Sequence, residues 1–323
     1  MGDLWDVGRK EIEDSFSSRK FLIILGLFLI LSLTSVYFGV DNYQTQLDQF
    51  GEGGNTIYGQ QPEKPSLIEV FNPLINANLA LTAGLLGLFL SYNFISRERE
   101  EGTMELLLSY PVYRDEIING KLVAGIFTVA FTLLIAFIVS SGLAMFMLGQ
   151  IPSLTVLSRL SFIWMGTTLY ITFFLSLGTL LSTIFRSQWR SLAVGVLLLF
   201  GFLGMPLIAN IAAPVIYSYD SPSAGSGVAT GGMNVENSRQ ESNREEVMAK
   251  RERFTSVVSN LSPVTNYNRY NDAILGTQYE TDEGLEPTFR ESLETALDPL
   301  IYLISQTALA LAASYMIFLR QDM

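Results

Sequence analysis

Long uninterrupted apolar runs alternate with polar, charged segments along this chain. The first run, Phe21–Val40, contains no charged residue and is long enough to cross a hydrocarbon core of about 30 Å as an α-helix. Five further runs follow, and they cover Leu74 or Ala77 to Ile95, Leu122–Leu148, Leu157–Phe185, Ser191–Ile216 and Leu300–Leu319. The pattern predicts an all-α polytopic membrane protein with six transmembrane helices.

An amphipathic stretch, residues 1–20, precedes the first run. Its apolar residues recur about every four positions, which predicts a helix lying in the membrane interface with one apolar face. A solvated helix without membrane contact is the alternative. Arg19 and Lys20 also resemble the start of a cleaved signal peptide, but the apolar run is too long and no A-x-A site follows. We therefore expect the first span to be retained.

Two connections between the expected spans are very short. Gly149–Ser158 joins the third and fourth spans, and Arg186–Arg190 joins the fourth and fifth. Helices joined this tightly are expected to run antiparallel and side by side. Pro206 and Pro214 lie in the second half of the fifth span, where a lost backbone hydrogen bond predicts a bend.

Basic residues predict the orientation. With the N-terminus inside, the inner segments hold Arg9, Lys10, Arg19, Lys20, Arg97, Arg99, Arg114, Lys121, Arg186, Arg190 and Arg320. The short outer loops hold only Lys64 and Arg159. We expect the protein to lie in the plasma membrane. By the positive-inside rule, both of its termini are expected in the cytoplasm.

The long segment 217–298 is expected outside the cell. Tyr219–Gly232 is rich in Gly, Ser and Ala and predicts a flexible tether. Apolar spacing predicts a helix over Asn237–Asn260 and a second helix over Asn268–Leu275, ending at Gly276. We expect a helical outer cap without a core of its own. The chain then divides into residues 1–20, the membrane part 21–216, the outer segment 217–298 and the last span with its tail, 299–323.

Composition excludes several classes of protein. The chain has no Cys and no His, which removes disulfides, thiolate metal sites and the commonest general base. The net charge is −11, and 19 of the 31 acidic residues fall in the expected outer segments 41–76 and 217–298. This balance argues against a nucleic-acid partner.

Motifs for nucleotide hydrolysis and ion coupling are absent from the sequence. No G-x-x-x-x-G-K-[ST] pattern occurs, so the chain is not expected to hydrolyse ATP, and it is not expected to be an enzyme or to hold a cofactor. The apolar runs contain almost no ionisable residues, which disfavours a proton- or ion-coupled carrier.

The segment Ser96–Lys121 is a charged, helix-prone interval between the second and third spans. Ser96 is a candidate N-cap for a helix with an acidic first turn. The acidic residues are Glu98, Glu100 and Glu101. An apolar stripe of Met104, Leu107 and Leu108 follows before Pro111 ends the helix. A solvated loop is the alternative, and charge alone does not decide between them.

The run from Glu98 to Val112, EREEGTMELLLSYPV, is followed by Glu116-Ile117 and Gly120-Lys121. It resembles the signature that follows the second span in type-2 ATP-binding-cassette (ABC) transporter permeases, close to E-x-E-x-G-T-x-E-x-L-L-x-x-P-V. A looser similarity is Leu261-Ser262-Pro263 with Tyr267 and Ala273-Ile274-Leu275-Gly276, which is similar to the S-P-containing segment that many members carry before the last span. The resemblance covers the whole chain.

The resemblance implies that 97–110 is a cytoplasmic coupling helix that docks on a separate ATP-binding subunit, and that 1–20 is a membrane-surface elbow helix. The residues expected to bind this subunit are Glu98, Glu101, Gly102, Thr103, Met104, Glu105, Leu106, Leu107 and Leu108, with Arg186, Trp189 and Arg190 as a second contact. The acidic residues would pair with basic groups, and the stripe would supply buried area.

The resemblance also implies a homodimer of permeases with two ATPase subunits, which hold ATP and magnesium, and a membrane lipid environment. Export of a substrate is one expectation. The alternative is mechanotransmission to an extracellular partner protein, as in permeases of the nitrous-oxide reductase maturation type. A membrane protein without any ATPase partner is a third. The substrate is not specified by the apolar spans.

Overall fold

The computed structural model describes residues 19–51, 65–102, 114–218, 233–276 and 288–320. Within these ranges every regular element is helical. The longest elements are α2 (Arg19–Gly51), α6 (Arg114–Leu148), α7 (Leu154–Ile184), α8 (Gln188–Ser218), α9 (Met233–Asn260) and α11 (Phe289–Arg320). The shorter ones are η1 (Leu67–Phe71), η2 (Pro73–Leu79), α3 (Ala80–Ser91), α4 (Ser96–Glu100) and α10 (Pro263–Leu275). The all-α prediction is confirmed for the described residues.

Five helices in the described part of the chain are long and apolar enough to cross a membrane, namely α2, α6, α7, α8 and α11. A sixth crossing is obtained if the bent pair 67–75 and 80–100 counts as one span. The helices extend beyond the apolar runs: α2 continues to Gly51, and α11 begins at Phe289. Polar residues continue a helix once the apolar part has formed, because each adds a backbone hydrogen bond at little cost in entropy.

The second span is not the continuous helix that the sequence predicts. The chain bends by 52° between its two parts. The bend lies at η2, a π-helix that starts at Pro73. In a π-helix each amide pairs with the carbonyl five residues earlier, so the α-helical hydrogen-bond ladder is interrupted here. The apolar run hides this break, because hydropathy does not report backbone pairing.

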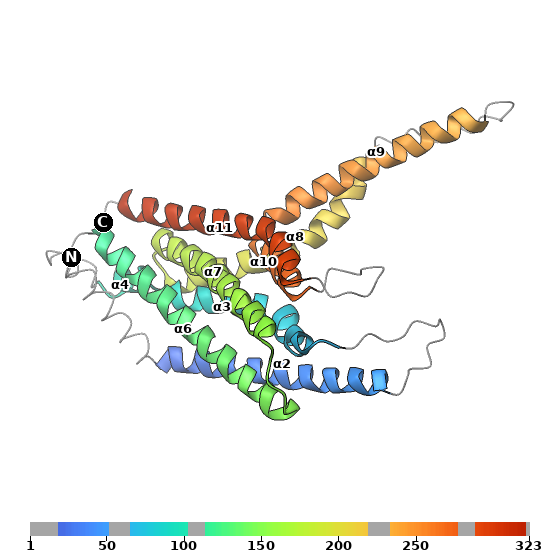
Figure 1. Ribbon diagram of the computed structural model, residues 1–323. Coiled ribbons are helices and arrows are strands. Elements are labelled where there is room, and N and C mark those ends of the chain that lie inside the picture. The colour runs from blue at the N-terminus through green and yellow to red at the C-terminus, as the bar shows by residue number, and fades with distance from the viewer. Residues whose placement is uncertain (1–18, 52–64, 103–113, 219–232, 277–287, 321–323) are drawn as a thin grey trace.

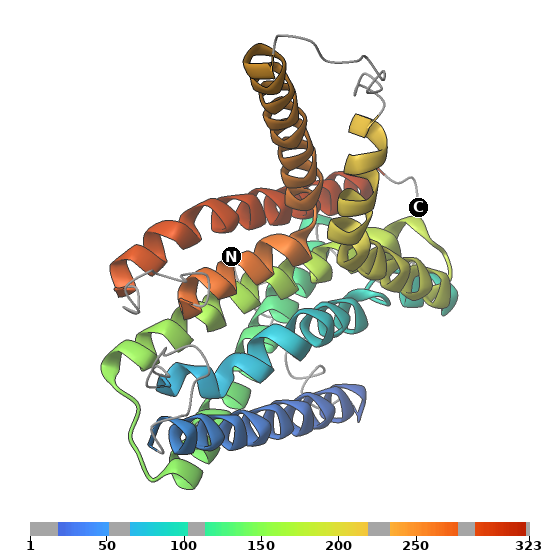
Figure 2. The same ribbon diagram turned by 90° about the vertical axis from the view of Figure 1, so that its right-hand side faces the viewer.

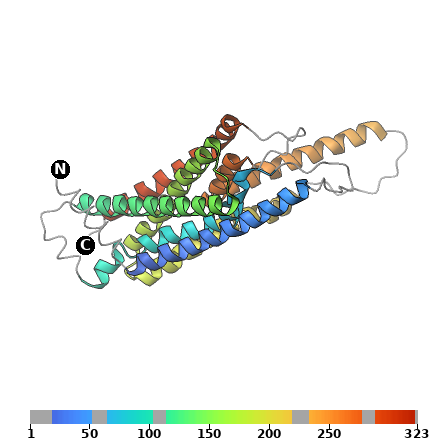
Figure 3. The same ribbon diagram turned by 60° about the horizontal axis from the view of Figure 1, so that its bottom comes forward.

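The bundle has two distinct ends (Figure 1). The Arg19 end of α2, the short helix α4 and the Arg320 end of α11 lie together at one end, which we call the α4 end. Helix α9 projects from the opposite end, which we call the α9 end, and Figure 3 shows it extending well past the other helices. The start of α2, the first described helix, and the end of α11, the last one, therefore both lie at the α4 end.

Helix α7 is the centre of the bundle. It packs against α3, α6, α8, α10 and α11, and its apolar stretch is the most buried among the candidate spans. Glycines bring α3 and α7 close together. A Cβ on Gly178 would lie 2.1 Å from the Ser91 Oγ, and one on Gly87 would lie 2.7 Å from the Ile171 carbonyl oxygen. Only glycine fits at Gly87, which faces backbone atoms, and a side chain at Gly178 would displace the Ser91 hydroxyl.

The described part of segment 217–298 holds α9, α10 and the start of α11, and the two expected helices have other bounds than predicted: α9 begins at Met233 rather than Asn237. Helix α10 begins at Pro263 rather than Asn268 and ends at Gly276, which has a φ of 81°. Proline fits the first turn of a helix because its missing N–H has no partner there in any case. The buried side of α10 packs against α7 and α11.

Helix α8 holds Pro206 and Pro214 in its second half, and Figure 2 shows the helix turning there, as predicted. Pro206 cannot donate to the Phe202 carbonyl, which stands four residues earlier. The Ser262 hydroxyl donates to that carbonyl instead, at 2.8 Å. The same Ser262 oxygen accepts from the Thr265 amide at 3.2 Å and so caps α10. One serine therefore completes the proline bend of α8 and starts α10.

Replacing Ser262 by Ala is expected to lower the free energy of unfolding by about 1–3 kcal/mol, because the Phe202 carbonyl loses its donor and α10 loses its cap. Pro206→Ala restores a backbone donor for that carbonyl. A double-mutant cycle, read by thermal unfolding in detergent, should therefore show a smaller loss for Ser262→Ala in the Pro206→Ala background. Additive losses would contradict this role of Ser262.

Candidate functional site at the α4 end

The expected ATPase-binding residues fall partly within the described structure. Glu98, Glu101 and Gly102 lie at α4, while Arg186, Trp189 and Arg190 lie where α7 passes into α8. Thr103, Met104, Glu105, Leu106, Leu107 and Leu108 lie outside the described residues, and so do residues 1–18 of the expected elbow helix 1–20, whose last two residues begin α2. The two predicted contact segments are neighbours, since α4 packs against α8.

The coupling segment does not run as one helix over 97–110. Helix α4 ends at Glu100, and Gly102 has a φ of 68°, a left-handed conformation that terminates helices and that glycine adopts without strain. The prediction that Ser96 caps the helix is also wrong. Its hydroxyl donates to the Tyr92 carbonyl at 3.0 Å, and Ile95 occupies the N-cap position without a side-chain hydrogen bond.

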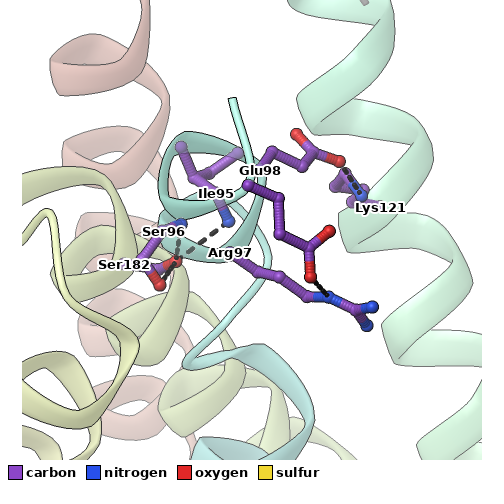
Figure 4. A network of polar contacts seen from close by, with 7 residues as sticks. Ile95, Ser96, Arg97, Glu98, Lys121 and Ser182 are labelled. Carbon is purple, nitrogen blue, oxygen red and sulfur yellow. Dashed lines mark hydrogen bonds and ion pairs between the residues drawn. The ribbon is translucent and has the colours of Figure 1, made fainter. Parts of the chain in front are cut away.

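The start of α4 is fastened to the end of α7 by one side chain (Figure 4). The Ser182 Oγ accepts from the backbone amides of Ile95 and Ser96, each at 2.9 Å. All three residues are fully buried. The first N–H groups of a helix have no partner within the helix, so an acceptor from α7 stabilises this turn and fixes its place. Sequence reasoning missed Ser182, because a serine within an apolar run carries no signal.

Three more hydrogen bonds connect α4 with the end of α7 and the start of α8. The Arg99 guanidinium donates to the Thr183 carbonyl at 2.8 Å. The Glu100 carboxylate accepts from the backbone amide of Gln188 at 3.2 Å and from its side-chain amide at 2.8 Å. Glu100 was not among the predicted site residues. Its acidic charge was visible, but its bond to a residue 88 positions away was not.

Glu98 makes its ion pair within the subunit. Its carboxylate forms an ion pair with Lys121 of α6 at 3.0 Å, and the two side chains are only 15% and 9% exposed (Figure 4). The Lys121 ammonium also lies 5.9 Å from the centre of the Phe94 ring. Glu98 thus anchors α4 to α6 and leaves little surface for a partner.

Replacing Lys121 by Met is expected to lower the free energy of unfolding by about 3–5 kcal/mol, because the buried Glu98 carboxylate loses its positive partner. Combining Lys121→Met with Glu98→Gln removes the charge that lost its partner and should recover most of this loss. Thermal unfolding of the two purified variants is the measurement. A double variant no more stable than Lys121→Met would contradict the role of the pair.

The other predicted site residues that the structure describes are exposed. Glu101 pairs with Arg97 at 2.8 Å, and both side chains are about half exposed. Trp189 is 70% exposed, and Arg186, Arg190 and Gly102 are exposed as well. Among the described residues no three carboxylates gather in a group that could hold a metal ion. The surface offers an aromatic anchor between charged groups, which is typical of a protein docking site.

Comparison with known proteins identifies related sequences. The family described as "ABC-2 family transporter protein" matches residues 5–323. The probable ABC transporter permease protein NosY of Stutzerimonas stutzeri is 32% identical over 137 residues, 42% of this chain and 44% of that protein. The protein of the same name from Pseudomonas aeruginosa is 29% identical over 198 residues, 60% of this chain and 64% of that protein. Both matches cover less than two thirds of the relative's length.

Proposed function

Because the chain belongs to the ABC-2 family of transporter proteins, we propose that it is the permease subunit of an ATP-binding-cassette exporter. A separate subunit binds and hydrolyses ATP with magnesium. Two relatives named as probable ABC transporter permeases support this assignment. The helical bundle and its five or six candidate spans make the chain an integral membrane protein.

The α4 end is the cytoplasmic end in this proposal. The basic residues there, including Arg97, Arg99 and Arg186, support it through the positive-inside rule. Because the described ends of α2 and α11 lie at the same end, both termini of the chain belong in the cytoplasm.

One observation carries the proposal: the predicted coupling segment is bonded to the α7–α8 connection through Ser182, Thr183 and Gln188. Two segments 80 or more residues apart in sequence thereby form one surface. A partner that grips this surface can displace α3, α7 and α8 together, since packed elements move as rigid bodies. In the exporter, the ATP-binding subunit is that partner, with Glu101 and the stripe Met104, Leu107 and Leu108 as its contacts.

The complete exporter is a homodimer of this chain with two ATP-binding subunits, surrounded by membrane lipid. ATP binding draws the ATP-binding subunits together, and the coupling segments pass this movement into the spans. The described residues of a single copy supply five crossings, or six if the bent pair counts as one.

A second function is favoured by the projection of α9 from the end opposite α4 (Figures 1 and 3). In this alternative the subunit transmits ATP-driven movement to an extracellular protein without moving a substrate. The long, largely polar α9 offers such a protein a surface outside the membrane.

The ATPase activity of the purified complex distinguishes the two functions. An exporter in lipid vesicles should hydrolyse ATP faster when its substrate is present, tested with lipids, hydrophobic drugs and peptides. Stimulation by an extracellular protein alone, with no response to any small substrate, would instead establish mechanotransmission. A complex without an ATP-binding subunit or ATPase activity would overturn both.

A further inference from the structure

The end of α7 opposite Ser182 holds helix α10. Tyr267 of α10 shares a 2.8 Å hydrogen bond with the Thr167 hydroxyl, and Tyr270 donates from its hydroxyl to the Phe162 carbonyl at 2.8 Å. The buried Arg159 donates to the Leu275 carbonyl at 2.8 Å, at the last turn of α10. Three side-chain bonds thus fix α10 along its whole length.

The side chains of α7 and α10 are also closely packed. Gly166 faces the ring of Tyr270, and a Cβ there would lie 2.2 Å from a ring carbon. Tyr267 stacks on Tyr170 with ring centres 4.3 Å apart and an interplanar angle of 18°. Both tyrosines are fully buried. Such a contact allows little sliding, because interdigitated side chains have few alternative arrangements.

Tyr170 also connects this contact to the second span. Its hydroxyl donates to the Ala80 carbonyl at 2.8 Å, at the first residue of α3 and directly after the bend in η2. The bend therefore lies next to the α10 contact, and α3 leads from there to α4.

Helix α7 is continuous between its two contacts. It runs from Leu154 to Ile184 without an internal proline, whereas α8 holds two. An uninterrupted buried helix transmits displacement better than a bent one, because its backbone hydrogen bonds leave no hinge.

The base of α9 is fixed to the same body. The Asn260 carbonyl, at the last residue of α9, accepts from the Asn266 amide of α10 at 2.8 Å and from the Gln306 amide of α11 at 2.9 Å. Ser262 joins α10 to the bend of α8, as described above. A tilt of α10 must therefore tilt α9 as well.

We propose that α7 and α10 form one lever, with Tyr267 as its positioning residue, that carries displacement of α4 at one end of the bundle to the arm α9 at the other. This inference rests on the proposed function only for the source of the displacement. The connection itself is a property of the isolated subunit. It gives the arm a defined movement whether the subunit exports a substrate or acts on an outer protein.

The lever is tested first in the subunit alone, without any ATPase. Because the chain has no Cys, the substitutions Met248→Cys on α9 and Asp48→Cys on α2 introduce its only two thiols. Each thiol then carries a spin label. Both positions are exposed. Labelled chains are diluted with unlabelled wild type, so that the distance within one copy is measured. Met248 lies about 18 Å along α9 from Asn260, so a tilt of about 10° moves its label by about 3 Å.

Gly166→Val places a wedge between α7 and α10 and should shift this distance by about 3 Å or more. Gly142→Val, in α6 with open space around it, should leave the distance unchanged. An unchanged distance in a folded Gly166→Val subunit would overturn the lever. Tyr267→Leu, which removes the stack, provides the same test if Gly166→Val does not fold.

The second test uses the complete complex with magnesium, ATP and vanadate. The wild-type distance should change in the vanadate-trapped state, and Tyr267→Leu should reduce that change to less than about half, while its ATP hydrolysis, measured without vanadate, continues. Tyr302→Leu, at an exposed position of α11, is the control. Hydrolysis with an unaltered distance change in Tyr267→Leu would overturn the lever. A complex without hydrolysis refutes the proposed function, while the wedge experiment still decides the lever.

Discussion

Gly178→Leu is expected to prevent α3 and α7 from packing and to destabilise the folded subunit by about 3 kcal/mol or more. The reason is steric. Even a Cβ at this position would lie 2.1 Å from the Ser91 Oγ, and the Leu88 Cα is 3.6 Å away. Helix α3 cannot retreat freely, because Gly87 holds it against the backbone of α7 at a second place. The yield of monodisperse protein and its thermal unfolding temperature are the measurements.

Gly142→Leu is the matched control for this substitution. It adds the same side chain to another membrane helix, at a glycine with nothing within 4 Å of its Cβ position. Its unfolding temperature should stay at the wild-type value. If the two leucine variants behave alike, close packing of α3 on α7 is not what holds the bundle together.

The double substitution Glu101→Arg and Leu107→Asp is expected to abolish co-purification of an ATP-binding subunit. Glu101 lies exposed beside α4, and Leu107 belongs to the apolar stripe predicted from the sequence. Reversing a charge and placing a carboxylate in the anchor should weaken binding by about 2 kcal/mol or more, a loss of at least about 30-fold. Affinity purification from membranes, followed by an ATPase assay of the eluate, gives the result.

Glu294→Arg is the control for charge reversal. Glu294 pairs with Arg290 in the same i, i+4 arrangement that joins Glu101 to Arg97, but it lies near the start of α11 at the α9 end. This variant should retain the ATP-binding subunit fully. Full retention by the Glu101→Arg and Leu107→Asp variant would exclude the α4 segment as the docking site.

The apolar runs predicted the membrane helices well, because burial in lipid requires about 20 apolar residues whatever the neighbours are. Each of the five unbroken candidate spans has at least one end near the predicted limit, such as Leu148 in α6. The short connections also predicted correctly that α6, α7 and α8 pack in sequence. These features depend on local sequence alone.

The features that sequence reasoning missed depend on contacts between distant residues. Glu98 is exposed or buried according to whether Lys121 stands opposite, and nothing in its neighbours tells which. Ser182 acquires its role only when α4 folds back onto α7. The bend at η2 was missed because hydropathy is insensitive to backbone pairing.

The role of Ser262 also depends on a contact between residues that are distant in sequence. Its resemblance to a family segment was visible, but its physical role was not. Only the proximity of the Pro206 bend explains why a hydroxyl is required before Pro263.

Site-specific cross-linking tests most directly the claim that the α4 end receives an ATP-binding subunit. Because the chain is free of Cys, a single Cys introduced at Glu101 or Trp189 can carry a photoreactive maleimide in membranes. Both positions should cross-link to the ATP-binding subunit, and Glu294→Cys at the other end should not. Cross-links from position 294 with none from 101 and 189 would contradict the account.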